Sequence, residues 1–178
     1  MRVLTIVLAL IAVVATWLVF GPRPDKPPAA PPAGYLRAKG DAFFASSFKQ
    51  FGSAVLPLRP FEGKPVIVYF WATWCVECRD ESRALLALQA KYRGSGLAVV
   101  GIGVDQADKI ERFARENQID YPVFVGGGEG IELARKMGNL RGDIPFIAAI
   151  DRRGQVTSVH VGKSRAATLE ALATDALK

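Results

Sequence analysis

Short apolar runs alternate with segments of helical periodicity along most of the chain. Residues 65–71 (PVIVYFW) and 97–104 are continuous apolar runs, which are typical of strands buried on both faces. Residues 75–93 and 110–117 place apolar side chains at helical spacing, with charged residues between them. Strands that alternate with helices in this way predict an α/β fold, with a central, partly parallel sheet flanked by helices.

Two predicted hairpins make this sheet mixed. The first joins residues 48–51 to residues 54–58, and the second joins residues 146–150 to residues 156–161. Turn-forming residues separate the two runs of each pair, which favours antiparallel pairing.

Three further elements complete the pattern. A short strand is expected at residues 123–125, a short helix at 130–137 and a closing helix at 165–177. The glycine-rich stretch 126–130 is expected to be a flexible loop, because no Lys-Ser/Thr follows it and its spacing does not match a phosphate-binding loop.

The N-terminus has the pattern of a membrane-targeting segment followed by a spacer. Residues 3–20 carry no charge and would span roughly 27 Å as a helix, close to the thickness of a bilayer core. We therefore expect residues 1–20 to be an uncleaved signal-anchor, with a cleaved signal peptide as the alternative. Residues 21–39 are rich in proline and predict a semi-rigid linker, so the globular domain is expected at residues 40–178.

Composition narrows the classes of function. The formal net charge is +6, but Lys and Arg are scattered without a run of three, and acidic residues lie between them. This pattern indicates a mildly basic surface and no nucleic-acid partner. The chain has two cysteines, three positions apart, whereas a secreted disulfide scaffold needs more of them, spread along its length.

The two cysteines stand where redox chemistry is expected. Cys75 and Cys78 follow a buried strand and open a helix, in the sequence WCVEC. Free N–H groups and the positive dipole at the start of a helix favour a thiolate. Cys75 in the first turn is predicted to attack a substrate disulfide, and the more shielded Cys78 is predicted to resolve the mixed disulfide. We therefore predict that Cys75 and Cys78 are the catalytic pair.

Two other uses of a cysteine pair fit poorly. Structural zinc takes four ligands as a rule, and His160 is the one histidine that the chain offers beside the cysteines. A purely structural disulfide would close a four-residue loop, which constrains little of the unfolded chain. No metal site is expected, and His160 is expected to lie at the surface or at a strand edge.

Several short motifs match those of a known family. They occur in order along the chain: GKP at residues 63–65, VYFWATWC at 68–75, CRxE at 78–81, IP at 144–145 and IDRRG at 150–154. With this set, the chain resembles the TlpA/ResA-like family of membrane-anchored thioredoxin-fold thiol:disulfide oxidoreductases over roughly residues 40–175.

The resemblance implies a fold and a set of site residues. The fold would be a thioredoxin fold, with a central mixed sheet flanked by helices, an N-terminal β-hairpin and a central insertion. Pro145 would be a cis-proline against the Cys75–Cys78 pair, and the backbone of Ile144 would bind a strand of the substrate. Trp74 would be an exposed wall beside Cys75 that contacts the substrate. Taken alone, the Ile144-Pro145 pair would indicate only a turn.

The resemblance also implies a function. The protein would reduce protein disulfides on the periplasmic side of the inner membrane, with clients from cytochrome c maturation or copper-site assembly. A membrane protein would supply the electrons. No cofactor is expected apart from the redox-active disulfide Cys75–Cys78, and the soluble domain is expected to be monomeric.

Several positions around the cysteines depart from related patterns. Glu77 occupies a position where the family has proline. Together with Val76, it is expected to tune the reduction potential of the cysteine pair. The negative charge of Glu77 opposes thiolate formation at Cys75, which makes the pair more reducing. Tyr69 occupies the place of a buried aspartate in thioredoxins, so the proton-transfer acid must come from elsewhere. Glu81 is one candidate, although a solvated helix charge is the simpler interpretation of this residue.

Two other functions stay open. A disulfide donor or isomerase would use the same cysteine pair in a different direction, although isomerases tend to be dimers with an extra domain. A Cu(I)-handling chaperone would bind this soft ion through two thiolates. A peroxidase is disfavoured because the motif P-x-x-x-T-x-x-C is absent.

Overall fold

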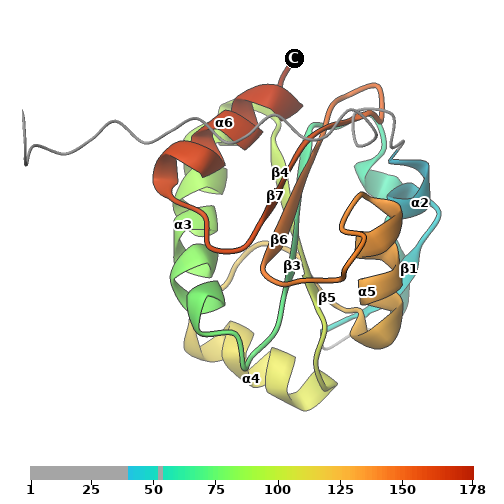
Figure 1. Ribbon diagram of the computed structural model, residues 1–178, viewed down its shortest axis with the longest axis vertical. Coiled ribbons are helices and arrows are strands. Elements are labelled where there is room, and N and C mark those ends of the chain that lie inside the picture. The colour runs from blue at the N-terminus through green and yellow to red at the C-terminus, as the bar shows by residue number, and fades with distance from the viewer. Residues whose placement is uncertain (1–39, 52–53) are drawn as a thin grey trace, which may run out of the picture.

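The computed structural model describes residues 40–51 and 54–178 of the 178-residue chain. One mixed sheet runs through the middle of this part, and helices cover both of its faces (Figure 1). The predicted membrane segment at residues 1–20 and the predicted linker at 21–39 lie outside the described residues. In the part that is described, no helix is both long enough and apolar enough to cross a membrane.

The sheet has seven strands in the order β2-β1-β5-β4-β3-β6-β7. Their bounds are β1 Ser47–Gln50, β2 Val55–Pro57, β3 Val66–Trp71, β4 Ala98–Gly103, β5 Val123–Val125, β6 Phe146–Ile150 and β7 Val156–Val161. Strand β3 pairs in parallel with β4 and antiparallel with β6, so it lies inside the sheet. All six of its residues are buried, which explains its unbroken apolar sequence.

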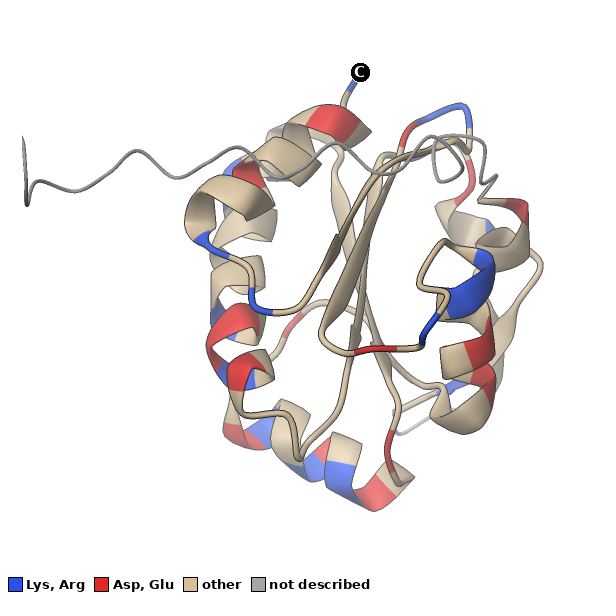
Figure 2. Ribbon diagram, in the orientation of Figure 1, with Lys and Arg blue, Asp and Glu red and all other residues tan. Residues whose placement is uncertain are grey.

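The helices lie on both sides of this sheet. They are α2 Asp41–Phe44, α3 Val76–Tyr92, α4 Ala107–Glu116, α5 Gly127–Lys136 and α6 Ala166–Ala176, with short 3-10 turns at Arg59–Phe61 and Arg93–Ser95. Basic and acidic residues are interleaved over the helices (Figure 2), as the scattered charge of the sequence predicts.

Strand β3 separates two hydrophobic cores, because successive side chains point to opposite faces of the sheet. Tyr69 and Trp71 belong to the core under α3 and α6, which also contains Cys75 and Cys78. Phe70 belongs to the other core, under α2 and α5. The cysteine pair therefore follows the central strand and belongs to the core under α3 and α6.

Both predicted hairpins are present. Strands β1 and β2 pair antiparallel, and so do β6 and β7. Strand β1 also pairs antiparallel with β5, which joins the N-terminal hairpin to the central sheet. The sequence did not predict α2, because a four-residue helix is too short to show a periodic pattern.

The glycine-rich stretch is helical, and the prediction of a loop there was wrong. Helix α5 begins at Gly127. The absence of side chains lets this turn approach β4 closely: a Cβ on Gly126 would lie 2.5 Å from Ile102 Cγ2, and one on Gly130 would lie 3.1 Å from the same atom. Tertiary packing here overrides the low helix propensity of glycine.

A buried carboxylate holds the turn between β6 and β7. Asp151 Oδ1 accepts hydrogen bonds from the backbone N–H of Arg153 at 2.9 Å and of Gln155 at 2.8 Å, and Oδ2 accepts one from Arg153 Nε at 3.0 Å. The same turn receives the start of the domain, because Gly40 N donates to Gly154 O at 2.7 Å. Burial opposes ionisation of Asp151, but the hydrogen bonds from Gln155 and Arg153 outweigh it and hold the pKa of this carboxyl below its usual value.

Replacing Asp151 with Asn is expected to destabilise the domain by about 1–3 kcal/mol at neutral pH, because two backbone donors lose a charged acceptor. The pKa of Asp151 is lower in the folded chain than in the unfolded chain, so the wild type loses this stabilisation as the pH falls through the folded-state pKa. Urea unfolding at neutral pH and at about pH 3 checks this prediction. The gap between wild type and D151N should narrow at the lower pH, and a constant gap would contradict the assignment.

Candidate active site

The two cysteines lie at the start of α3, directly after the central strand. Strand β3 ends at Trp71, and Cys75 is the N-cap residue of α3, whose first helical residue is Val76. Cys75 and Cys78 form a disulfide, with their Cα atoms 5.4 Å apart. Cys75 is 6% exposed and Cys78 is fully buried. The small accessible surface of the pair therefore belongs to Cys75, as the sequence predicted.

Exposed side chains flank this accessible sulfur. Trp74 is 68% exposed and Val76 is 84% exposed. Glu77 lies in the first turn of α3 and is also exposed. Trp74 thus has the position expected of a wall beside Cys75, and its contact with a substrate stays a prediction.

The peptide bond between Ile144 and Pro145 is cis, as the resemblance implied. Ile144 is partly buried and packs against both hydrophobic cores, one of which contains the disulfide. Pro145 O accepts a hydrogen bond from Gly162 N at 2.8 Å. The loop before the proline is held by Asn139, whose side chain donates to Asp143 O at 2.6 Å. The structure therefore brings a fixed backbone segment to the same core as the cysteines.

A buried carboxylate also lies in this region. Glu81, three positions after Cys78, is 3% exposed, so the interpretation of a solvated helix charge was wrong. Its Oε1 atom accepts hydrogen bonds from the backbone N–H of Ser164 at 2.6 Å and from the hydroxyl of the same residue. Its Oε2 atom is buried and has no partner within residues 40–51 and 54–178. Glu81 is inward because residues three and four apart share one face of a helix, and Cys78 and Leu85 line that face.

Two phenols share the layer behind the disulfide. The Tyr69 hydroxyl donates to Cys78 O at 3.1 Å, and the Ser82 hydroxyl donates to the same oxygen at 2.8 Å. Burial first, and then the negative charge of Glu81, raise the pKa of Tyr69 far above its usual value. Burial likewise raises the pKa of Tyr121. Both phenols keep their protons at neutral pH, so Tyr69 does not replace the buried aspartate of thioredoxins as a proton acceptor.

The sequence did not single out Asp105, which holds the turn before Cys75. The Thr73 hydroxyl donates to Asp105 Oδ2, and Gln106 N donates to Oδ1 at 2.7 Å. Burial opposes ionisation of Asp105, but these hydrogen bonds and the nearby Lys109 outweigh it and lower the pKa of the carboxyl. The carboxyl ends of parallel strands meet at one edge of a sheet, so the place of Asp105 just after β4 was the signal that could have revealed it.

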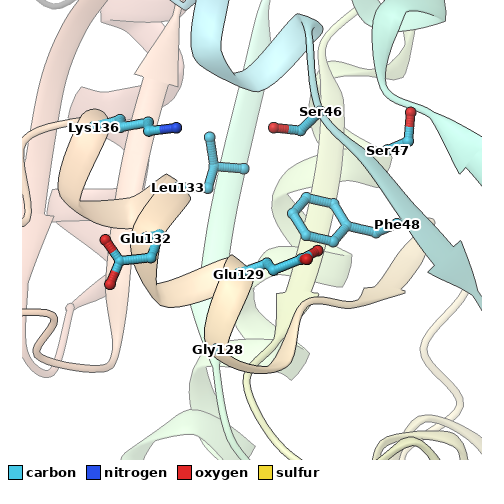
Figure 3. Close-up of a pocket in the computed structure, with 8 residues that line it drawn as sticks. All are labelled: Ser46, Ser47, Phe48, Gly128, Glu129, Glu132, Leu133 and Lys136. Atoms are coloured by element: carbon cyan, nitrogen blue, oxygen red, sulfur yellow. The ribbon is translucent and has the colours of Figure 1, made fainter.

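An open groove lies on the other side of the sheet. It runs between the start of β1 and α5 and has a volume of about 570 Å³. Phe48 and Leu133 line it and belong to the core under α2 and α5, whereas the disulfide belongs to the opposite core. Figure 3 shows Glu129 directed toward Phe48 and Lys136 directed toward Ser46 across the groove. The groove is therefore separate from the cysteine site.

Comparison with known proteins identifies the family. Residues 40–159 match the family model described as AhpC/TSA. The chain belongs to the AhpC/TSA family. Its fold is thioredoxin-like, as predicted. The structure superposes on that of a thiol:disulfide interchange protein from Chlorobium tepidum TLS with a TM-score of 0.66 and 27% identity. The superposition covers 88% of this AhpC/TSA family member and 100% of the Chlorobium chain.

Two relatives by sequence from Bacillus show the extent of the similarity. The thiol-disulfide oxidoreductase ResA of Bacillus thuringiensis subsp. konkukian is 28% identical over 116 residues, which is 65% of either chain. The thioredoxin-like protein YneN of Bacillus subtilis is 31% identical over 120 residues, covering 65% of this AhpC/TSA family member and 67% of YneN. The match thus spans 65% of the length of ResA.

Proposed function

We propose that this AhpC/TSA family member is a thiol:disulfide oxidoreductase that reduces disulfides of client proteins. The observation that carries the proposal is a cysteine pair at the start of a helix, with its accessible surface on Cys75 and with the buried carboxylate of Glu81 one turn beyond Cys78. Relatives named as thiol-disulfide oxidoreductases and interchange proteins support the same class of reaction.

The reaction would begin with the reduced pair. Cys75 lies at the N-terminus of α3, where backbone N–H groups and the helix dipole stabilise a thiolate. This thiolate attacks one sulfur of a client disulfide, the client S–S bond breaks, and a mixed disulfide to Cys75 forms. The first client sulfur leaves as a thiolate and takes a proton from solvent.

Cys78 would complete the exchange. Its S–H bond breaks, the proton passes to Oε2 of Glu81, and the new thiolate attacks Cys75 Sγ. The bond between Cys75 and the client breaks, and the second client sulfur leaves as a thiolate. That thiolate takes up a proton released by Glu81, so the client gains two thiols while Cys75 and Cys78 become a disulfide.

The client would bind through its backbone beside the cis-proline. No hydrogen bond engages the backbone N–H or C=O of Ile144 within the described ranges 40–51 and 54–178. An extended client segment can therefore add to this backbone as a short strand. Trp74, exposed beside Cys75, would cover one side of the client disulfide.

We also propose the compartment and the partners that the sequence suggested. Residues 1–20 would tether the domain to the inner membrane, on the periplasmic side. A membrane donor would return two electrons and two protons to the Cys75–Cys78 disulfide after each cycle. Clients would come from cytochrome c maturation or copper-site assembly, where cysteines must be reduced in an oxidising compartment.

The reduction potential of the Cys75–Cys78 pair tests the direction of the reaction. The full chain in detergent would be equilibrated in dithiothreitol and glutathione buffers, and its free thiols counted at each ratio. Thioredoxin-fold pairs range from about −270 mV in reductants to about −120 mV in oxidants. A potential below about −220 mV supports a reductase, whereas one above about −150 mV would make the protein a disulfide donor.

Replacing Glu77 with Gln is expected to make the pair less reducing, by about 10–20 mV. Removal of this exposed negative charge favours a thiolate at Cys75, and stabilising the reduced form raises the potential. The same thiol titration measures the shift, and E116Q, which changes an exposed acidic residue at the end of α4, serves as the control. An unchanged or more negative potential for E77Q would contradict the proposed tuning.

A further inference from the structure

Ser164 holds one oxygen of the buried carboxylate through two donors. Its backbone N–H lies 2.6 Å from Glu81 Oε1, and its hydroxyl donates to the same oxygen. The two residues are 83 positions apart in the chain, and both are buried, with Ser164 9% exposed. Hydrogen bonds to a charged acceptor are strong where water is excluded. These two bonds therefore hold the Glu81 side chain in one orientation.

The other oxygen of the carboxylate is left without a partner. Glu81 Oε2 is buried, and no group among residues 40–51 and 54–178 donates to it in hydrogen-bond geometry. The Tyr69 hydroxyl faces this carboxylate but donates to Cys78 O instead, at 3.1 Å. Unpaired buried acceptors are costly and uncommon in native proteins, so each one calls for an explanation such as a catalytic role. Because Oε1 already accepts two hydrogen bonds, Oε2 is the atom at which a proton can be added.

The loop that carries Ser164 also holds the cis-proline. Gly162 N donates to Pro145 O at 2.8 Å. The loop is closed at its base by a contact of 3.2 Å between His160 Nε2 and Lys163 O. The three residues 162–164 therefore connect the backbone beside the cis-proline to the carboxylate of Glu81.

We propose that Ser164 is a positioning residue for disulfide exchange: it orients Glu81 so that Oε2 alone receives the proton of Cys78, and its loop ties this orientation to the backbone at Pro145. This inference rests on the function proposed above. When Cys78 is deprotonated, its S–H bond breaks and an O–H bond forms at Oε2, while Ser164 gains and loses no proton. The new thiolate then attacks Cys75.

Stopped-flow kinetics with a chromogenic aromatic disulfide separates the two steps of the exchange. Reduced full-length protein is mixed with an equal amount of the reagent. The first release of the coloured thiolate reports the attack by Cys75, and the second reports the attack by Cys78. Wild type, S164A, S164T, S158A and E81Q are compared at neutral pH. S158A is the matched control. The hydroxyl of Ser158, in β7, is also buried, but it has no hydrogen-bond partner among the described residues.

In S164A we expect an unchanged first release and a second release about tenfold slower, since a charge-assisted hydrogen bond that orients Glu81 is lost. S164T retains the hydroxyl and should restore the second step, whereas S158A should match wild type in both steps. Rescue by S164T keeps the test valid if the alanine variant is less stable.

Three outcomes would count against the proposal, and each has a different meaning. If E81Q slows the second step but S164A matches S158A in the rate of that step, the positioning role of Ser164 is wrong and the role of Glu81 stands. If E81Q leaves the second step unchanged, the proton transfer to Glu81 is wrong and the inference about Ser164 falls with it. A slower first step in S164A would also overturn the inference, because it would place the effect on Cys75.

Discussion

Replacing Cys75 with Ser is expected to abolish disulfide reductase activity, by at least about a thousandfold in the reduction of insulin by dithiothreitol. The accessible sulfur of the pair is lost, and Cys78 is fully buried and does not take over the attack. Replacing Cys78 with Ser should have a different result, because Cys75 still attacks but the mixed disulfide is not resolved. C78S should therefore accumulate covalent complexes with client proteins.

Non-reducing gel electrophoresis, followed by mass spectrometry of the trapped species, measures this difference. C75S should show no complexes, and the double variant C75S/C78S is the control for non-specific trapping. The assignment of the two roles would be wrong if C75S trapped clients and C78S did not. Equal trapping by both single variants would mean that either sulfur accepts a client disulfide.

Replacing Glu81 with Gln is expected to slow the attack by Cys78 about a hundredfold, because general base catalysis contributes factors of this size or more. The amide oxygen can still accept the two hydrogen bonds of Ser164, but the side chain no longer takes up a proton. The attack by Cys75 should keep its rate, since Cys75 lies on the exposed side of the pair.

The matched control for E81Q is D80N, which changes the neighbouring carboxylate on the exposed face of α3. D80N should behave as wild type in both steps of the exchange. A second step that is equally fast in E81Q and D80N would contradict the proton-acceptor role. If E81Q is less stable than D80N, its midpoint temperature of thermal unfolding will be lower. Kinetic assays below that temperature separate this loss of stability from the effect on the rate.

Most elements of the fold follow from local patterns. Strand β3 is buried on both faces, and its sequence is therefore apolar at every position. An unbroken apolar run of this kind is visible in the sequence. Strands β5, β6 and β7 begin and end at the residues that the sequence predicts. Helix α5 did not follow the pattern, because its glycines are required by contact with Ile102 of β4 rather than by local preference.

The candidate site likewise contains residues that the sequence identified and residues that only the structure revealed. The cysteine pair is recognised from adjacent residues, since the strand, the WCVEC motif and the helix are consecutive in the chain. Glu81 was identified as a candidate proton-transfer acid, but its burial was not predicted. The spacing of three from Cys78 and four to Leu85 was a sequence signal that Glu81 lies on the inward face. The partners of the carboxylates had no such signal.

The sequence by itself determined the α/β class, the mixed sheet and the cysteine pair, because each depends on hydrophobic periodicity or on residues close together in the chain. The thioredoxin fold and the cis-proline position followed from the family resemblance that the set of short motifs carries. Only the tertiary structure decided that Glu81 is bound by Ser164, 83 positions away, and that Thr73 is bound by Asp105, 32 positions away. Local patterns carry no information on which distant loops meet. That is set by the order of strands in the sheet, which brings the β7–α6 loop against α3 and the end of β4 against the end of β3.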